Sequence, residues 1–598
     1  MLFPREHKLV SMEKAIASIN DGDMLLIGGE FNGRVPAALV REVLRQRKKN
    51  LTLVGHASGI PLDLLCAGGC ATEIQLTRLS FEREFGNAYN YRRAVENGKI
   101  RSKDQCCPVI NQQLRASAFG LPWMPIMPHI SYTDFMKLHP EWKLMDDPMR
   151  PGEKIVLVPA LKPNVYLVHC SKADIYGNWV VEHESFNEML YSKAADRVIV
   201  SAEEIVTTEE LRKTCGLMFP PHFDPFYPFF KTSHVVHLLF GAHPTHCYPH
   251  YTYDRQHIEE YQEYASVSDE RFKEYLDRYV YGCKTHDEYL EKIGGVAKLN
   301  SLSNWRKPFT DFCESTEREE SQAEKITDYG IDELMVVVVS RYIQGNMLHW
   351  HGGDSYLPMA ALRFAKLTHA PDIIYCGGVT GYINPSPAYL PDMANDFSYC
   401  HDVEVYYEFE HLFDLVERSE TRLMFFSGAQ IDKYGNVNAT LLGSPDNIKV
   451  KLAGGGGTGQ IMGKPPVVII WTAAHEKHSG RYTLVDKVDF ITGHGNPPPG
   501  IQYPGEIGPT ACVTDLGVFS FDKETGLMKL EALYPDTTVE MILENTGFKL
   551  IIPDKVPQVK PPTREQIDIL RRLADPTGIR RKEFLPKQLE RRFKLGSS

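Results

Sequence analysis

Long hydrophobic runs, closely spaced cysteine pairs and an excess of basic residues are all missing from this chain. No apolar run reaches the roughly 18 residues that a membrane-spanning helix needs, and the N-terminal residues contain no apolar signal core. Its 12 cysteines among 598 residues are too sparse for a disulfide scaffold, and no Cys-x-x-Cys pair indicates a zinc ribbon. We therefore expect a cytoplasmic protein with reduced thiols and no membrane partner.

The charge balance excludes a further class of function. Lys and Arg number 66 against 77 Asp and Glu, which gives a net charge of −11. An acidic chain of this kind is a poor nucleic-acid binder and favours a small-molecule enzyme. Since 598 residues exceed the size at which one core keeps growing, we expect two or more domains.

What the chain does contain is the same module twice. Asp174–Asn178 (DIYGN) returns as Asp432–Asn436 (DKYGN), and Gly28-Gly29-Glu30 returns as Gly352-Gly353-Asp354. These correspondences keep their order along the chain, so we predict two homologous domains. Two like domains on one chain create a cleft, and small-molecule sites form in such clefts.

Each module begins with the pattern of a βαβ unit. In the first, apolar residues 24–27 end at a glycine pair, residues 35–47 have helical spacing, and residues 51–54 form the next apolar run. This order predicts a parallel sheet with a right-handed crossover. The other elements expected in the first half are strands 155–168, 179–182 and 194–201 and acidic helices 257–275 and 278–293.

These patterns divide the chain into two domains and a connection. We predict a first α/β domain over residues 1–300, of which 216–300 form a helical appendage. The polar, charged residues 301–328 are the expected linker. The second α/β domain is expected over residues 329–598, ending in a charged helix pair at 562–583.

At this point the motifs resemble a known family, the class I CoA-transferases of the glutaconate type. The first half resembles the A subunit, on Leu114-Arg115-Ala116, Ser201–Ile205 and Gly241–Pro244. The second half resembles the B subunit, on Thr368–Asp372, Gly454–Gly457 and Val513–Phe519, and its tail is similar to that of the branch whose members open the last steroid ring as a CoA thioester. The resemblance implies two open α/β CoA-transferase domains fused in tandem. It also implies an acyl-CoA substrate, no metal, no tightly bound cofactor and a possible homodimer.

One feature of the family pattern is missing. The resemblance implies a B-module glutamate that takes CoA from the thioester, placed just after the strand that follows Ala370–Asp372. Residues 373–381 contain no acidic residue. The sequence therefore favours a hydrolase of a cyclic or β-keto acyl-CoA, cleaving a C–C or a thioester bond. The alternatives are a CoA-transferase whose glutamate lies in another loop and an inactive CoA-binding protein.

The candidate catalytic residues are those able to activate water in the expected cleft. They are Glu30, in the loop after the first strand, Asp104, and His351 in the equivalent loop of the second module. His56 fits either a packed histidine or an acid–base group. Alignment with the steroid-ring branch puts Cys107 nearest to the catalytic glutamate implied there. The pair Cys106-Cys107 is expected to serve packing or to support the site, with a catalytic thiol as the alternative.

The candidate binding residues are glycines that allow close backbone approach and arginines that hold a carboxylate. The glycines are Gly28, Gly29, Gly352, Gly353, Gly377, Gly378, Gly454, Gly455, Gly456 and Gly457. The arginines are Arg34 and Arg115. The charged residues Glu82, Arg83, Arg92 and Arg93 are expected to form a solvated face.

Overall fold

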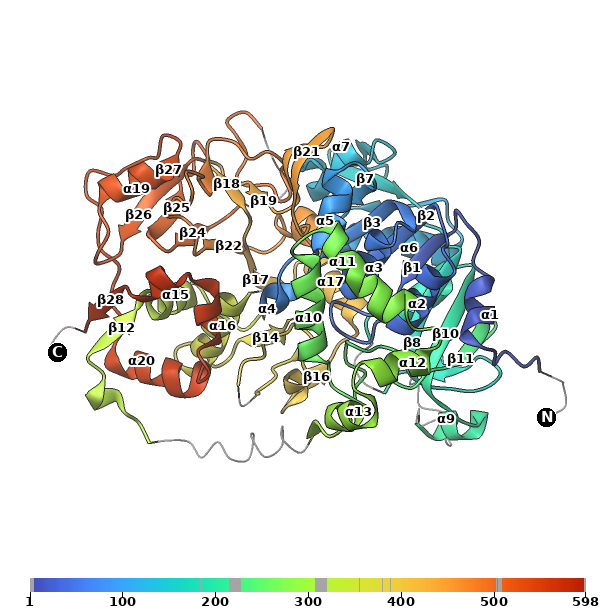
Figure 1. Ribbon diagram of the computed structural model, residues 1–598. Helices are drawn as coiled ribbons and strands as arrows, with labels where there is room; N and C mark the ends of the chain where they lie inside the picture. The colour runs from blue at the N-terminus through green and yellow to red at the C-terminus, as the bar shows by residue number, and fades with distance from the viewer. Residues whose placement is uncertain are drawn as a thin grey trace.

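The computed structural model describes residues 5–595 apart from 183–184, 215–226, 228, 307–319, 354, 379, 388, 502 and 504–507. The two modules lie side by side, the first in blue to green and the second in yellow to red (Figure 1). Each is built on a large, mainly parallel sheet covered by helices. Most of the aromatic segment at residues 219–230 lies outside the described residues.

The first sheet confirms the predicted βαβ start. Its parallel strands run in the order β11-β10-β8-β1-β2-β3-β4, and the short β9 adds antiparallel to β8. The strands are β1 (Met24–Ile27), β2 (Leu51–Ser58), β3 (Ala71–Leu79), β4 (Arg101–Asp104), β8 (Val165–Ala173), β9 (Trp179–Val180), β10 (Arg197–Ile205) and β11 (Thr232–His237).

Helices cover both faces of this sheet because alternate strand residues are apolar on each side. Leu25 and Ile27 pack with one cluster, whereas Leu26 packs with the other. The first face carries α1 (Met12–Ala17), α2 (Ala37–Arg45), α3 (Ile60–Ala67) and α5 (Tyr89–Glu96), and the second carries α6 (Cys107–Phe119) and α8 (Glu188–Ala194).

Two expectations for the first half need correction. The predicted strand 155–168 is two strands in different sheets, β7 (Lys154–Pro159) and β8, because Pro159 and Pro163 interrupt the run. β7 pairs instead with β5 (Trp123–Ile126) and β6 (Lys143–Asp146). The predicted strand 179–182 is only the two-residue β9.

The helical appendage is present, but its helices are shorter than expected. They are α10 (Arg255–Ala265), α11 (Asp269–Leu276) with a π-helical turn at Asp277–Tyr281, α12 (His286–Lys292) and α13 (Gly295–Ser303). Ser268 and Thr285 start new helices by accepting backbone N–H bonds from Arg271 and Glu288, which is why the long runs are divided.

The second sheet repeats the topology of the first. The parallel order β14-β13-β17-β22-β24 corresponds to β2-β1-β8-β10-β11, so the sequence repeat is a structural repeat. The parallel strands are β13 (Leu348–Trp350), β14 (Ile374–Gly377), β17 (Thr421–Phe426), β22 (Val467–Thr472) and β24 (Ala511–Thr514). Antiparallel strands extend the edges as β15 (Tyr382–Ile383), β16 (Val405–Tyr406), β25 (Gly517–Phe521) and β26 (Met528–Leu533).

The DxYGN turn has the same geometry in both modules. Asp174 Oδ1 accepts the backbone N–H groups of Tyr176 and Asn178, each at 2.9 Å. Asp432 Oδ1 accepts those of the equivalent Tyr434 and Asn436 at 3.0 and 3.1 Å. The repeat therefore extends to individual hydrogen bonds.

The cores of the two modules are continuous. In the second module α15 (Ile331–Ser340), α16 (Tyr356–Leu367) and α20 (Arg564–Ile569) cover one face of the sheet, and α17 (Phe409–Glu417), α18 (Thr458–Ile461) and α19 (Val539–Asn545) cover the other. The second of these clusters also includes Phe31, Ala57 and Cys107 of the first module. The modules therefore share apolar packing across their junction.

The chain tail returns to the junction instead of forming a plain helix pair. α20 is followed by a π-helical turn at Leu570–Ala574 and a 3-10 helix at Ile579–Glu583. The strands β12 (Asp328–Gly330) and β28 (Arg592–Lys594) pair antiparallel and form a two-stranded ribbon. No helix among the described residues is both long and apolar enough to cross a bilayer.

Candidate functional site

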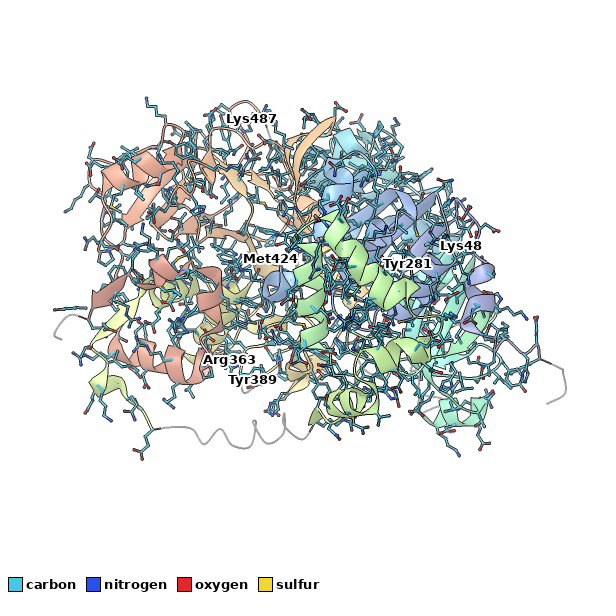
Figure 2. All side chains as sticks on the ribbon, in the orientation of Figure 1. Lys48, Tyr281, Arg363, Tyr389, Met424 and Lys487 are labelled. Atoms are coloured by element: carbon cyan, nitrogen blue, oxygen red, sulfur yellow. The ribbon has the colours of Figure 1, made fainter. Side chains whose placement is uncertain are left out.

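A cavity of about 610 Å³ opens at the junction of the two modules. Most of its apolar lining comes from the second module, including Trp350, Phe409, Phe413, Met424 and Phe426. Met424 lies near the middle of the molecule in Figure 2. The polar lining comes mainly from first-module loops that follow β1, β2 and β3. Carboxyl ends of parallel strands meet at one edge of a sheet, which is where ligands bind in open α/β folds.

Glu30 and His56 form a buried pair in this cavity. Glu30 Oε1 lies 2.9 Å from His56 Nδ1 and accepts the Ala57 backbone N–H at 3.1 Å. Gly29 has φ of +80°, and a side chain there would meet the Gly33 carbonyl at 2.5 Å, so only glycine allows the tight turn that aims Glu30 at β2. The structure thus joins Glu30 to His56, the residue that the sequence left open.

Cys107 lines the same cavity as His56. It is the first residue of α6, and its thiol donates to Thr77 Oγ1 at 3.3 Å. Burial alone would lower the pKa of His56, but the neighbouring Cys107 sulfur and Glu30 carboxylate raise it to about 10. Burial raises the pKa of Glu30. Glu30 and His56 therefore form a hydrogen-bonded pair, in which His56 Nε2 remains buried without a hydrogen-bond partner.

This pKa shift makes stability depend on pH. His56 titrates near 6.5 in the unfolded chain and near 10 in the fold, so its contribution is complete below pH 6.5 and is lost as pH rises through 10. We expect the urea midpoint of the wild type to fall more between pH 7 and 10 than that of His56→Gln. His475→Gln is the matched control, because burial lowers the pKa of His475 to about 3. Equal slopes for wild type and His56→Gln would contradict the assignment.

Two more carboxylates line the same cavity. Glu82 is buried with φ of +58°, and its oxygens accept the Ala394 N–H at 2.9 Å and the Asn32 amide at 3.3 Å. Glu583, from the chain tail, accepts the Tyr356 N–H at 3.0 Å. The expectation that Glu82 belongs to a solvated face is wrong, since it packs at the module junction.

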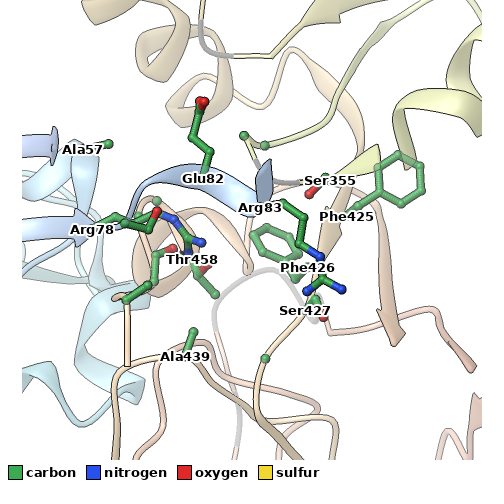
Figure 3. Close-up of a pocket in the computed structure, with 18 of the residues that line it drawn as sticks. Ala57, Arg78, Glu82, Arg83, Ser355, Phe425, Phe426, Ser427, Ala439 and Thr458 are labelled. Carbon is green, nitrogen blue, oxygen red and sulfur yellow. Dashed lines mark hydrogen bonds between the residues drawn. The ribbon is translucent and has the colours of Figure 1, made fainter. Parts of the chain in front are cut away.

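Two arginines bring positive charge to the cavity wall. Arg78, at the end of β3, donates to the Gly454 carbonyl at 3.0 Å, and Arg83 bonds to the tail carbonyl of Lys582 at 3.2 Å. Figure 3 shows Arg83 extending toward Phe426 and Ser427, whereas Glu82 points to the other side. These cations suit an anionic substrate group, and no motif in the sequence singled out Arg78.

The glycine loops predicted to bind substrate lie partly in the cavity. Gly352, Gly353, Gly455, Gly456 and Gly457 line it. The Gly456 N–H already donates to the Thr77 carbonyl at 3.0 Å. A side chain on Gly454 would meet that same carbonyl at 2.5 Å, so Gly454 serves the contact between modules.

Asp104 and His351 lie outside the 610 Å³ cavity. Asp104 is buried and pairs with Lys451 Nζ at 2.9 Å. His351 has both ring nitrogens engaged, by the Gly352 carbonyl, the Tyr375 hydroxyl and the Gly378 N–H, and burial lowers its pKa to about 4. Their predicted role in activating water does not fit these positions. Asp354, the counterpart of Glu30, lies outside the described residues.

The remaining predicted binding residues have structural partners elsewhere. Arg34 pairs with Glu188 at 2.5 Å, and Arg115 bonds to both oxygens of Asp414 at 2.8 and 2.9 Å beside a second cavity. These positions do not fit substrate binding in the 610 Å³ cavity. Gly28 packs on Tyr166, and Gly377 and Gly378 pack on Tyr399.

The cavity is not lined by any described residue of the segment that lacks the family glutamate. Cys376, in the middle of it, is fully buried in β14 and absent from the cavity lining, and burial raises the pKa of its thiol. The acidic side chains that line the cavity therefore come from other segments of the chain.

Two groups of possible metal ligands occur among the described residues, both outside the cavity lining. In the buried group of His169, Glu203 and Cys247, the carboxylate already accepts bonds from His169 at 2.7 Å and from the Tyr251 hydroxyl at 2.7 Å. The other group, Glu408, Glu410 and His411, is on the surface side of α17. Neither group includes Glu30, His56 or Cys107.

Comparison with known proteins agrees with this architecture. The family model for coenzyme A transferase matches residues 9–216 and 334–545, one stretch in each module. Both components of glutaconate CoA-transferase from Acidaminococcus fermentans are 30% identical to this chain. The A subunit matches over 49% of the chain and 94% of its own length, and the B subunit over 42% and 94%.

Other relatives extend the picture. A protein of Archaeoglobus fulgidus is 33% identical over 49% of this chain, which spans 64% of that protein. The cholesterol ring-cleaving hydrolase IpdA subunit of Rhodococcus jostii is 27% identical over 49% of the chain and 98% of its own length. A solved acyl-CoA transferase of Escherichia coli O157:H7 covers 93% of the chain and 96% of its own length with a TM-score of 0.62 at 15% identity, which shows a common fold.

The family match covers most of the chain, and its two stretches coincide with the two structural modules. The A and B subunits of the glutaconate enzyme match 49% and 42% of the chain, so each covers less than half of it. This chain therefore belongs to the coenzyme A transferase family, as a class I member in which the counterparts of the A and B subunits are fused.

Proposed function

We propose that this chain hydrolyses an acyl-CoA thioester in the cavity between its modules. The observation that carries the proposal is the buried Glu30–His56 pair on the cavity wall, 2.9 Å apart, next to an apolar lining suited to an acyl chain. A carboxylate that fixes the imidazole lets the ring pass protons to and from the reacting acyl group. The resemblance to ring-cleaving hydrolases favours a cyclic or β-keto acyl group.

The absence of a carboxylate from residues 373–381 supports hydrolysis over transfer. Class I transfer needs a carboxylate that carries CoA as a thioester. The second candidate function is nevertheless a CoA-transferase, and the observation that favours it is that Glu82 and Glu583 line the same cavity. Both are held by backbone N–H groups, which makes them poorer nucleophiles.

The proposed reaction needs acyl-CoA and water and no resident cofactor. Since one chain supplies both modules, it also needs no second copy, and a homodimer stays a prediction. The third possibility, an inactive CoA-binding protein, predicts tight CoA binding without turnover.

The test is to incubate the full chain with acetoacetyl-CoA and butyryl-CoA in water enriched in ¹⁸O. We expect free CoA together with acid that contains one ¹⁸O atom, at a rate that does not depend on added acetate. If the acid retains only ¹⁶O, or release of CoA requires acetate and yields acetyl-CoA, the chain is a transferase. A carbon–carbon cleavage would instead leave the CoA thioester intact and yield a shorter or ring-opened acyl-CoA.

A further inference from the structure

The neighbouring cysteines at the start of α6 have different environments. Cys106 Sγ donates to the Gly457 carbonyl at 3.0 Å and accepts the Gln460 N–H at 3.2 Å, so it joins α6 to α18 of the other module. Burial raises the pKa of the Cys106 thiol well above its usual range. Cys107 packs in the apolar cluster at the module junction and also lines the cavity, as His56 does. Cys106 therefore serves packing alone, whereas Cys107 is also part of the cavity wall.

Glu30, His56 and Cys107 come from three stretches at the carboxyl edge of one sheet. Glu30 follows β1, His56 lies near the end of β2, and Cys107 follows β4. The Glu30 bond occupies His56 Nδ1, whereas His56 Nε2 is buried and has no hydrogen-bond partner, and Cys107 lines the same cavity. A thiol next to an imidazole that a third group orients is the arrangement of an activated nucleophile.

We propose that Cys107 is the nucleophile that removes the acyl group from CoA, a role that rests on the proposed hydrolase function. In the first step the Cys107 thiolate attacks the thioester carbonyl, the C–S bond to CoA breaks, and the His56 imidazolium protonates the departing CoA thiolate. In the second step neutral His56 takes a proton from water, the hydroxide attacks the acyl-Cys107 thioester, and the acid leaves as Cys107 regains its thiolate.

The surroundings of the sulfur favour this chemistry. Cys107 opens a 13-residue helix, whose N-terminal end stabilises negative charge. Its thiol donates to Thr77 Oγ1 at 3.3 Å, and this hydroxyl can turn to donate to the sulfur once the thiol has lost its proton. The Glu30 carboxylate, 2.9 Å from Nδ1, stabilises the imidazolium form of His56, the form that protonates the departing CoA thiolate.

The glycine run lets a substrate approach this sulfur closely. A Cβ atom added to Gly456 would lie 4.0 Å from Cys107 Sγ, so the glycine loop passes close to the thiol. The aromatic lining of Phe409 and Phe413, whose rings lie 5.3 and 5.5 Å from that of His56, shields the His56 side of the site from water. An acyl group held between loop and rings would have its carbonyl carbon next to the sulfur.

The mass of the covalent adduct on the protein distinguishes this route from the usual route of the family. A thiol nucleophile takes the acyl group and releases CoA, whereas a carboxylate nucleophile ends up carrying CoA. We would mix the full chain with butyryl-CoA, quench in acid within milliseconds to seconds, and map adducts by peptide mass spectrometry. We expect a butyryl adduct on the peptide that contains Cys107.

Variants test the same step. Cys107→Ala should lose the adduct and at least about 100-fold in hydrolysis rate, whereas Cys376→Ala, which removes a buried thiol outside the cavity, should keep both. If Cys107→Ala does not fold, the second measurement is iodoacetamide alkylation of the wild type. It should be fastest at Cys107, be blocked by butyryl-CoA, and slow at least about 10-fold in His56→Gln because the imidazolium no longer stabilises the thiolate.

The outcomes separate this proposal from the proposed function. Hydrolysis that persists in Cys107→Ala without an adduct overturns the nucleophile and leaves the hydrolase. A CoA adduct on Glu82 or Glu583 overturns both. An acyl adduct that maps to another residue overturns the nucleophile alone.

Discussion

Glu30→Gln is expected to lower kcat for thioester hydrolysis by about 10³- to 10⁴-fold. Glu30 Oε1 accepts from His56 Nδ1 at 2.9 Å and from the Ala57 N–H at 3.1 Å, and the amide oxygen of glutamine keeps both bonds but carries no negative charge. The imidazolium that His56 must form during the reaction is then no longer stabilised by a carboxylate, so proton transfer by the ring becomes costly. The substrate KM should change much less than kcat, because the apolar lining of the cavity stays in place.

This loss should occur without unfolding. Burial raises the pKa of Glu30, so a neutral side chain of the same shape is tolerated there. The matched control is Asp63→Asn, another buried carboxylate of the first module that lies outside the cavity lining and accepts the Tyr91 N–H at 2.8 Å. It should retain kcat within about threefold while losing some stability. Equal activity in Glu30→Gln and wild type would show that the pair does not take part in the reaction.

The fold follows from local patterns that the sequence displays. The short apolar runs at residues 24–27 and 51–54 and the DxYGN turn depend on neighbours within a few residues, so the predicted βαβ start and the tandem repeat are confirmed. The proline-interrupted run at 155–168 was misread because strand assignment there depends on which sheet each half joins. Capping serines and threonines within the appendage likewise decide where its helices divide.

The candidate site depends on contacts that no local pattern contains. Arg34 and Arg115 look like carboxylate binders in the sequence, but Glu188 and Asp414 lie 154 and 299 residues away along the chain. Glu583 reaches the cavity from the tail. The positions of Glu30 and His56 at successive strand ends were a usable signal, because parallel strands bring their carboxyl ends together. For Cys107 the signal was its alignment with the catalytic position of a relative.

Lys451→Met is expected to lower the free energy of unfolding by about 3–5 kcal/mol, the cost of leaving a buried charge without its partner. Lys451 Nζ lies at 2.9 Å from Asp104 Oδ1 and donates to the carbonyls of Thr440 and Leu452, both also at 2.9 Å. Lys451 is fully buried and Asp104 nearly so, and the bond connects β21 (Asn447–Lys451) of the second module to β4 of the first. The variant should therefore loosen the junction that forms the cavity.

A double-mutant cycle separates the structural from the catalytic role of this pair. Asp104→Asn combined with Lys451→Met removes both charges, so the urea midpoint should recover most of the loss of Lys451→Met alone. If Asp104 acts only by holding the modules together, the double variant should also regain the kcat of the wild type. A double variant that is stable but has lost activity at least about 100-fold would return Asp104 to the catalytic residues. Because the cavity walls come from both modules, we expect kcat to follow the stability of the junction through the series.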